Sequence, residues 1–167
     1  MGVLYSATST LPTDLEKLVL LEGMVAELLS AAPTVENSEL VHYNLTLATH
    51  ELCVNIIEHA FNGVQGDFTL RMSLRNDPLR FEAETEDRGS RVFSNSDWSP
   101  PKLDDTPVRG LGIWLIRQLM DFVLYTNNDG VNHWRIVKQL QPAPQIAHVP
   151  AQAIMGQNGT AGSARGF

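Results

Sequence analysis

Two segments in the N-terminal half of the chain carry apolar residues at helical spacing. Thr13-Asp14-Leu15-Glu16 fits a capping box, which predicts the start of an amphipathic helix that ends before Pro33. The second segment begins near Ser38 and contains the run LATHELCVNIIEHAF, whose apolar residues surround most of the helix. This second segment predicts a largely buried helix. The apolar stripe of the first helix is less continuous, because Glu22 interrupts it.

After the second helix the pattern changes to a period of two, which is typical of strands. Apolar and polar residues alternate over 68–75 and again over 79–86, on either side of the turn Asn76-Asp77-Pro78. Two alternating segments joined by a short turn predict a β-hairpin with one buried face.

A third helix and a second pair of strands are expected toward the C-terminus. The helix runs from about Gly112 to Asp121, and the strands Phe122–Thr126 and Val131–Leu140 flank the turn Asn127-Asn128-Asp129-Gly130. Residues 88–109 are polar and have no period, so they are interpreted as a long loop. Loops of that length in a compact domain are usually functional or disordered.

One domain is expected over residues 1–140, because a chain of 167 residues, 43% of them hydrophobic, can bury a substantial core. Residues 141–167 are dominated by Ala, Gly, Pro and Gln, with little to pack. That composition predicts a flexible C-terminal tail.

The charge of the chain argues against general nucleic-acid binding, which needs a basic face. The formal net charge is −7, the pI is about 5.1, and the Lys and Arg residues are scattered. Cys53 is the single cysteine, which excludes an internal disulfide and a cysteine-ligated zinc site and suits a reducing compartment. No run approaches the roughly 20 apolar residues of a membrane span, and no secretion signal is recognisable, so a cytoplasmic location is expected.

Three polar residues interrupt the apolar second helix at a spacing of four: Glu51, Asn55 and His59. That spacing places their side chains along one stripe of the helix. A carboxylate and an amide beside a core are costly unless something satisfies them, and a ligand together with a metal ion would do so.

Asp87 continues the inward phase of the second hairpin strand, after positions 79, 81, 83 and 85. Its carboxylate is therefore expected to point toward the helices, where it could accept a hydrogen bond from an exocyclic amino group such as that of adenine. Gly89 follows, where a ligand can approach the backbone closely. The alternative is that Asp87 merely ends the strand and starts a turn, which Asp often does.

Gly110-Leu111-Gly112 leads directly into the third helix. Glycines before a helix N-terminus leave backbone N–H groups free to bind phosphate oxygens, although an ordinary loop-to-helix turn would look the same. The segment is not a Walker A loop, since no Gly-Lys-Ser/Thr follows, and no strand precedes it as in a Rossmann fingerprint.

Taken in order, these features resemble the histidine-kinase-like ATPase superfamily and, more narrowly, the anti-sigma-factor serine/threonine kinases of bacterial partner-switching systems. The resemblance spans about residues 10 to 140, where ELCVNIIEHAF, EDRGS and RGLGIWLIRQLMD are similar to the N, G1 and G2 boxes. It implies an α+β domain with the Bergerat ATP-binding fold. In that fold, a two-layer α/β sandwich, helices cover one face of a mixed, mostly antiparallel sheet.

The resemblance also implies roles for individual residues. In the N box, Asn55 would hold Mg²⁺ and Glu51 would be the general base that deprotonates an attacking hydroxyl, while no catalytic role follows for His59. Oxygen ligands suit Mg²⁺, and phosphoryl transfer depends mainly on positioning and charge neutralisation.

The G1 and G2 boxes would bind the nucleotide. Asp87 would bind the adenine amino group and Gly89 would make room for the base, while Gly110, Leu111 and Gly112 would bind phosphates and residues 93–109 would form the ATP lid. Arg91 departs from the pattern, because the G1 box usually has a second glycine there.

The resemblance implies an ATP- and Mg²⁺-dependent serine/threonine kinase that phosphorylates a small anti-anti-sigma (STAS-type) protein, sequesters a sigma factor, or does both. No direct contact with nucleic acid or membrane is expected. A non-catalytic nucleotide-binding or partner-sequestering switch is the alternative, motivated by Arg91. A homodimer stays open, since relatives commonly pair. A metal-dependent hydrolase built on His50, Glu51, Glu58 and His59 is disfavoured, because Val54 stands where the second histidine of a zinc-protease motif should be.

Overall fold

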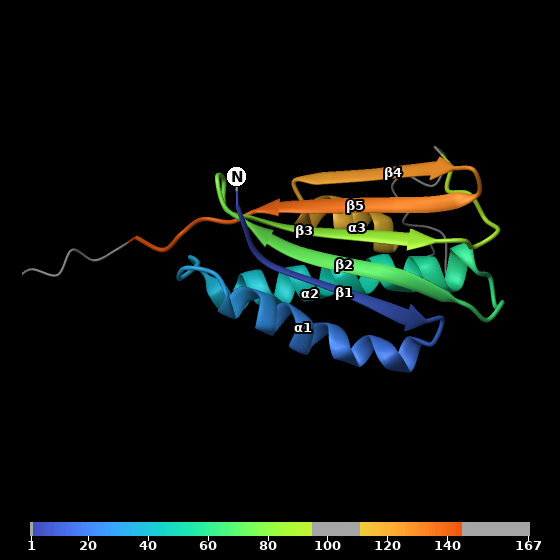
Figure 1. Cartoon of the computed structure of the whole chain (residues 1–167), viewed down its shortest axis with the longest axis horizontal. Helices are drawn as coiled ribbons and strands as arrows, with labels where there is room; N and C mark the ends of the chain where they lie inside the picture. Colours follow the sequence, from blue (N-terminus) through green and yellow to red (C-terminus); the bar gives the residue numbers. More distant parts are fainter. Residues whose placement is uncertain (1, 95–110, 145–167) are drawn as a thin grey trace, which may run out of the picture.

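The chain forms one five-stranded sheet in a computed structural model that describes residues 2–94 and 111–144. Neighbouring strands are all antiparallel, in the order β1-β2-β3-β5-β4 (Figure 1). The strands are β1 Val3–Pro12, β2 Asp67–Arg75, β3 Arg80–Asp87, β4 Phe122–Asn128 and β5 Val131–Gln139.

The helices form the second layer, with α2 and α3 behind the strands and α1 along the side of β1 (Figure 1). This arrangement confirms the predicted α+β class and the two-layer sandwich, although every described strand pair is antiparallel rather than mixed. No helix in the described ranges is long and apolar enough to cross a membrane. The helices are the 3₁₀-helix η1 Leu15–Val19, α1 Leu20–Ser30, α2 Ser38–Asn55, the π-helix η2 Ile56–Ala60 and α3 Leu111–Leu119.

The core lies between these layers, and the period-two pattern decides which strand residues enter it. The inward residues of β2 are at most 2% exposed, whereas Thr69 and Arg71 of the same strand face away from the helices. The predicted first hairpin is therefore confirmed, with Thr69 opposite Glu86 and Arg75 opposite Arg80. The inward residues of β2 are Phe68, Leu70, Met72 and Leu74.

Strand β1 is an element that the hydrophobic pattern does not predict. Its sequence, VLYSATSTLP, is rich in small hydroxyl residues, and much of the strand is exposed. Cross-strand pairing with β2, from Val3 opposite Arg75 to Pro12 opposite Asp67, supplies the stabilisation that its side chains lack.

The first helix begins one residue later than the capping box predicts. Asp14 is the N-cap and its Oδ1 accepts from the backbone N–H of Glu16 (2.9 Å). Thr13 instead accepts a hydrogen bond from the backbone N–H of Gly66 (3.0 Å), which holds the end of β1 close to the start of β2. The first turn is a 3₁₀-helix, as is frequent at helix termini.

The second helix widens into a π-turn at its C-terminal end. The backbone N–H of Phe61 donates to the carbonyl of Ile56 (3.1 Å), which is the hydrogen-bond spacing of a π-helix. Such turns are frequently found at functional sites. Cys53 is buried in the preceding turn, and burial raises the pKa of its thiol to about 12, so a reactive role is disfavoured.

The expected tail begins with an ordered contact. The backbone N–H of Glu36 donates to the carbonyl of Gln141 (2.8 Å), and the backbone N–H of Ala143 donates to the carbonyl of Thr34 (2.8 Å). These bonds tie the chain after β5 to the segment that precedes α2. The remainder of the predicted tail, residues 145–167, lies outside the described residues.

Candidate functional site

Asp87 ends β3 on the helix-covered face, as the alternation predicts. Its side chain is 2% exposed, and its Oδ1 accepts hydrogen bonds from the backbone N–H of Gly89 (2.9 Å) and from Nδ2 of Asn132 (2.8 Å). Oδ2 is buried and has no hydrogen-bond partner within the described ranges. Burial raises the pKa of Asp87, and the two hydrogen bonds oppose that rise. A buried acceptor without a donor is costly, so Oδ2 is a candidate contact for a ligand that donates a hydrogen bond.

Gly89 lies against the end of the π-turn. A Cβ built on it would stand 2.4 Å from the carbonyl carbon of Ala60 and 2.5 Å from its oxygen, so a larger residue does not fit. The hydrogen bond from the backbone N–H of Gly89 to Oδ1 of Asp87 also closes a turn that ends β3. The alternative interpretation, that Asp87 ends the strand and starts a turn, therefore holds as well. The glycine thus makes room for a helix backbone, and its role toward a base stays a prediction.

Arg91 is joined to the same helix end through its backbone. Its N–H donates to the carbonyl of Ala60 (3.2 Å), while its side chain is exposed. Among the described residues that are not glycine, those with positive φ are Asn37, Asn62, Asp77 and Asp129. Arg91 therefore has ordinary backbone geometry, and the position does not require the glycine that the G1 box usually has.

Glu51 and Asn55 lie one helical turn apart near the end of α2, and both are partly exposed. Oε1 of Glu51 is 3.7 Å from Nδ1 of His50. The regular four-residue spacing holds for this pair, whereas His59 falls in the π-turn, where the helix widens. The predicted stripe is therefore retained for the two residues to which the N box gives roles.

The start of α3 meets Glu51. A Cβ on Gly112 would lie 2.9 Å from Oε2 of Glu51, so the carboxylate sits against the second residue of this helix. Negative charge is favourable at a helix N-terminus. Leu111 is 43% exposed and begins the helix, while Gly110 and the predicted lid residues 95–109 lie outside the described residues.

One helix therefore contacts two of the predicted boxes. Glu51 meets the start of α3, and Ala60, nine residues further along, meets the segment after β3. At the usual rise per residue the two contacts are roughly 13 Å apart. The predicted base site and the predicted phosphate site therefore lie at different points along the same helix.

An aromatic cluster borders the segment that follows Arg91. The ring of Phe93 packs edge-on against Trp134 (centroids 4.8 Å apart) and Tyr125 (5.4 Å). The backbone N–H of Phe93 donates to the Tyr125 hydroxyl (3.0 Å), which donates to Oδ1 of Asn132 (2.6 Å). The chain after the G1 box is thereby joined to the network that holds Asp87.

Asn132 is the functional candidate that the motifs do not contain. It is 1% exposed and lies opposite Asp87 in the register of β3 and β5. Its signal in the sequence is a polar amide in the inward phase of β5, two residues before Trp134 and four before Ile136, both buried. Alternation alone gives no partner for it, because the pairing of β3 with β5 joins residues 45 apart.

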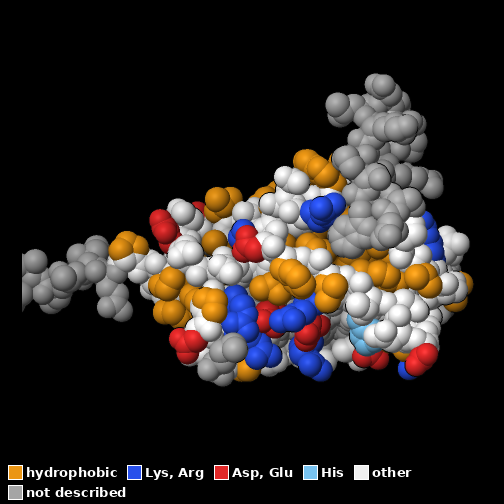
Figure 2. All heavy atoms as spheres, turned by 90° about the horizontal axis from the view of Figure 1, so that it is seen from above, with side chains coloured by type: hydrophobic (Ala, Val, Ile, Leu, Met, Phe, Trp, Pro, Cys, Tyr) orange, Lys and Arg blue, Asp and Glu red, His pale blue; other side chains and the backbone are white. Residues whose placement is uncertain are grey.

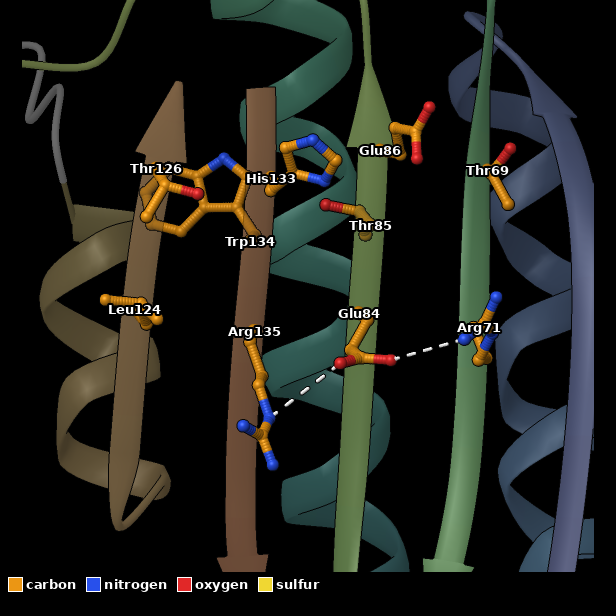
Figure 3. A pocket seen from close by; sticks show the side chains of 10 residues that line it. All are labelled: Thr69, Arg71, Glu84, Thr85, Glu86, Leu124, Thr126, His133, Trp134 and Arg135. Carbon is orange, nitrogen blue, oxygen red and sulfur yellow. Dashed lines mark ion pairs between the residues drawn. The ribbon is translucent and has the colours of Figure 1, made fainter. Parts of the chain in front are cut away.

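The uncovered face of the sheet carries a separate shallow groove of about 350 Å³ (Figure 3). There Glu84 lies between Arg71 and Arg135, with an N–O distance of 3.8 Å to each. In this groove, positive and negative side chains are therefore paired. Figure 2 looks onto a different side of the molecule, at 90° to Figure 1, and there too Lys/Arg and Asp/Glu side chains lie close together among hydrophobic ones.

The donor set between the helices and β3 fits a nucleotide with Mg²⁺. Asp87 Oδ2 supplies a buried acceptor and the Asn55 amide supplies an oxygen of the type that Mg²⁺ prefers. Within residues 2–94 and 111–144, no three or more His, Cys, Asp or Glu side chains form a group that could hold a metal ion.

Comparison with known proteins points to the same class of domain. The chain is 30% identical over 96 residues to the serine-protein kinase RsbW of Bacillus cereus (strain B4264), which covers 53% of this chain and 58% of the relative. It is 31% identical, with the same coverage, to the proteins of the same name from Bacillus thuringiensis subsp. konkukian and Bacillus mycoides. The alignments thus span little more than half the length of these relatives.

The wider match covers the described helices and strands β2, β3, β4 and nearly all of β5, while most of β1 precedes it. The model of the histidine kinase-like ATPase domain matches residues 11–138, which include Glu51, Asn55, Asp87 and Gly112. The predicted membership of the histidine-kinase-like ATPase superfamily is thereby confirmed. The chain belongs to the histidine kinase-like ATPase domain family.

Proposed function

We propose that this chain is a regulatory protein kinase that binds Mg·ATP and transfers the γ-phosphoryl group to a serine or threonine hydroxyl of a small protein partner. The observation that carries the proposal is the buried Oδ2 of Asp87, an acceptor without a donor beside the helix that carries Glu51 and Asn55. The relatives named serine-protein kinase support the reaction type.

Asp87 would accept a hydrogen bond from the exocyclic amino group of adenine. The backbone N–H groups of Gly110, Leu111 and Gly112 would bind phosphate oxygens at the start of α3. Asn55 would hold Mg²⁺ through its side-chain oxygen, and the ion, when bound, neutralises charge on the phosphates.

Glu51 would act as the general base. Its carboxylate would take the proton of the partner's hydroxyl while that oxygen bonds to the γ-phosphorus and the bond from the γ-phosphorus to the bridging oxygen of ADP breaks. The products are phosphorylated partner and ADP. The Glu51 carboxylate on α2 packs against Gly112 at the start of α3, where phosphate binding is predicted.

The partner would be an anti-anti-sigma protein of the STAS type, and a sigma factor would be the protein sequestered when the partner is phosphorylated. The similarity to RsbW proteins supports this assignment. Such partners imply a cytoplasmic location and control of transcription through protein contacts.

Phosphoryl transfer tests the proposal directly. Purified chain, Mg·ATP and STAS-type proteins from the same genome would be combined and each protein followed by intact-mass spectrometry. We expect one partner to gain one phosphoryl group with wild type and with the control Glu58→Gln, an exposed glutamate on the adjoining turn. Glu51→Gln should slow transfer by roughly 100-fold or more. No transfer by wild type, or equal transfer by Glu51→Gln, would refute the kinase assignment.

A non-catalytic switch is the second candidate, and Arg91 is the observation that favours it. Its backbone N–H donates to the carbonyl of Ala60 and its side chain is exposed, so this chain has an arginine where the G1 box usually has its second glycine. In that case the protein would bind nucleotide or partner without turnover. A phosphorylated partner in the experiment above would exclude it.

A further inference from the structure

We infer that Asn132 is a positioning residue for Asp87: it fixes the carboxylate so that one oxygen, Oδ2, is left to recognise the amino group of adenine. The inference rests on the proposed function and adds a specificity determinant to it. Asn132 lies opposite Asp87 at the start of β5, outside the three boxes, and both side chains are buried.

The amide of Asn132 uses its full hydrogen-bonding capacity. Nδ2 donates to Oδ1 of Asp87 (2.8 Å) and to the carbonyl of Gly89 (3.2 Å). Oδ1 accepts from the Tyr125 hydroxyl (2.6 Å) and from Nδ2 of Asn127 (2.8 Å). All four positions of a primary amide are thus matched with complementary groups.

This network permits one orientation of the amide. If the group were flipped, its oxygen would face the Asp87 carboxylate and the Gly89 carbonyl, and its nitrogen would face the amide nitrogen of Asn127. Acceptors would then meet acceptors in a buried site, which is strongly unfavourable. Tyr125 and Asn127 therefore hold the donor side of Asn132 toward Asp87.

The consequence for Asp87 is that its two oxygens become unequal. Oδ1 is occupied by two N–H donors, from Gly89 and Asn132, while Oδ2 has none within the described ranges. A proton on neutral Asp87 would thus reside on Oδ2. Ionised Asp87 offers an acceptor at Oδ2 and matches the amino group of adenine, whereas neutral Asp87 offers a donor there and opposes it.

The same hydrogen bond favours the ionised form of Asp87. Burial raises the pKa of Asp87, and the bonds from Asn132 and from the Gly89 N–H lower it. The charge of His133 on β5 also acts on Asp87, in the direction that lowers its pKa. Loss of the Asn132 donor should raise the pKa further, so that Asp87 becomes neutral at a higher pH.

The test is a calorimetric titration with Mg·ATP and with Mg·ITP, whose base carries a carbonyl in place of the amino group, from about pH 5.5 to pH 8.5. Asn132→Leu removes the donor, and Asn132→Thr keeps a hydroxyl donor. Asn128→Leu makes the same chemical change at an exposed position of β4 and serves as the control. A thermal melt of each variant reports folding.

We expect wild type and Asn128→Leu to prefer ATP over ITP. Asn132→Leu should bind ATP roughly 10-fold more weakly at neutral pH, lose most of its preference over ITP, and lose ATP affinity at a pH about one unit higher than wild type. Asn132→Thr should recover part of the affinity. A merely structural role would lower affinity for both nucleotides equally without moving the pH profile.

A folded Asn132→Leu variant with the wild-type pH profile and ATP preference would overturn the inference and leave the proposed function standing. Absence of ATP binding by wild type would overturn both. If Asn132→Leu does not fold, Tyr125→Phe removes one of the two donors that orient the amide. It should raise the pKa of Asp87, measured by carboxyl-carbon NMR, and weaken ATP binding about 3-fold. An unchanged pKa would then refute the inference.

Discussion

Glu51 and Gly112 lie so close that a Cβ on the glycine would stand 2.9 Å from Oε2 of the glutamate. The contact joins the predicted general base on α2 to the predicted phosphate-binding start of α3, two elements whose sequences give no indication that they touch. It also gives the second glycine of the G2 segment a role in this chain, which is to leave space for a carboxylate.

Gly112→Ala should therefore impair phosphoryl transfer more than it impairs folding. The methyl group would displace the end of the Glu51 side chain, and small misplacements of a catalytic group cost rate steeply. We expect a roughly 10-fold to 100-fold slower transfer at saturating ATP, with a loss of unfolding free energy of about 1 kcal/mol or less. Transfer at the wild-type rate would show that the contact does not position Glu51.

Gly89→Ala should destabilise the fold, because the methyl group would meet backbone atoms of Ala60 that cannot rotate away. We expect a loss of about 2–3 kcal/mol in urea-induced unfolding. Gly23→Ala is the matched control, since a Cβ at that position in α1 meets nothing within 4 Å. The control should raise stability by about 0.5–1 kcal/mol, and equal effects of the two substitutions would contradict the packing described here.

Glu82 gives the uncovered sheet face a pH-dependent contribution to stability. Burial raises the pKa of this side chain, but the hydrogen bond from Arg80 (2.6 Å) and the charges of Arg135, Arg80 and Arg75 bring it below 4.5 overall. A lowered pKa stabilises the fold above the unfolded value, near 4.5, and that stabilisation is lost as the pH falls through the folded value.

Glu82→Gln should cost about 2 kcal/mol at pH 7, because the buried side chain would lose the charge that pairs with the partly exposed guanidinium groups of Arg75, Arg80 and Arg135. The difference from wild type should shrink as the pH falls below about 4.5. Glu84→Gln, whose side chain is 41% exposed and pairs only at 3.8 Å, should cost under about 1 kcal/mol. Chemical denaturation between about pH 3 and pH 7 measures both, and a pH-independent difference for Glu82→Gln would refute this explanation.

The pKa of Asp87 is shifted in the opposite direction to that of Glu82, so its effect on stability also has the opposite sign. Its pKa is raised above 3.8, so the folded state retains the proton longer, and stability falls as the pH rises through the interval between 3.8 and the folded value. Asp87→Asn should therefore be more stable than wild type at pH 7, by about 1 kcal/mol, with the gain vanishing in acid. It should also lose ATP binding, since the variant offers an amide donor where adenine needs an acceptor. A variant less stable than wild type at every pH would contradict the burial argument.

Helices and strands with a strong hydrophobic periodicity could be predicted from the sequence, because burying one face of the element fixes which positions are apolar. The helix through Glu51 and the strands on either side of Asn76 follow from periods that no other structure explains equally well. Asp87 could be placed inward by counting residues along β3 alone. Strand β1 was not predicted, because its Ser and Thr residues give no clear alternation of apolar and polar positions. Its stability comes from pairing with β2.

The contacts between elements were beyond reach of local patterns. The π-turn after Asn55 depends on backbone hydrogen bonds that no residue type dictates, and it removes His59 from the regular stripe. Asn132 becomes meaningful only once β5 is known to pair with β3, which brings it opposite Asp87. The role of the buried Asn132 side chain therefore depends on which strands pair, and local sequence patterns do not determine that pairing.

The measurement that tests the central claim most directly is a calorimetric titration with ATP and ADP, with and without Mg²⁺, on wild type and Asp87→Ala. Asp67→Ala, at an exposed aspartate on β2, is the control. The nucleotide site described here predicts Mg²⁺-dependent ATP binding by wild type and by Asp67→Ala, a matching rise in melting temperature, and no binding by Asp87→Ala. Wild type that binds no nucleotide, or Asp87→Ala that binds as well as wild type, would contradict it.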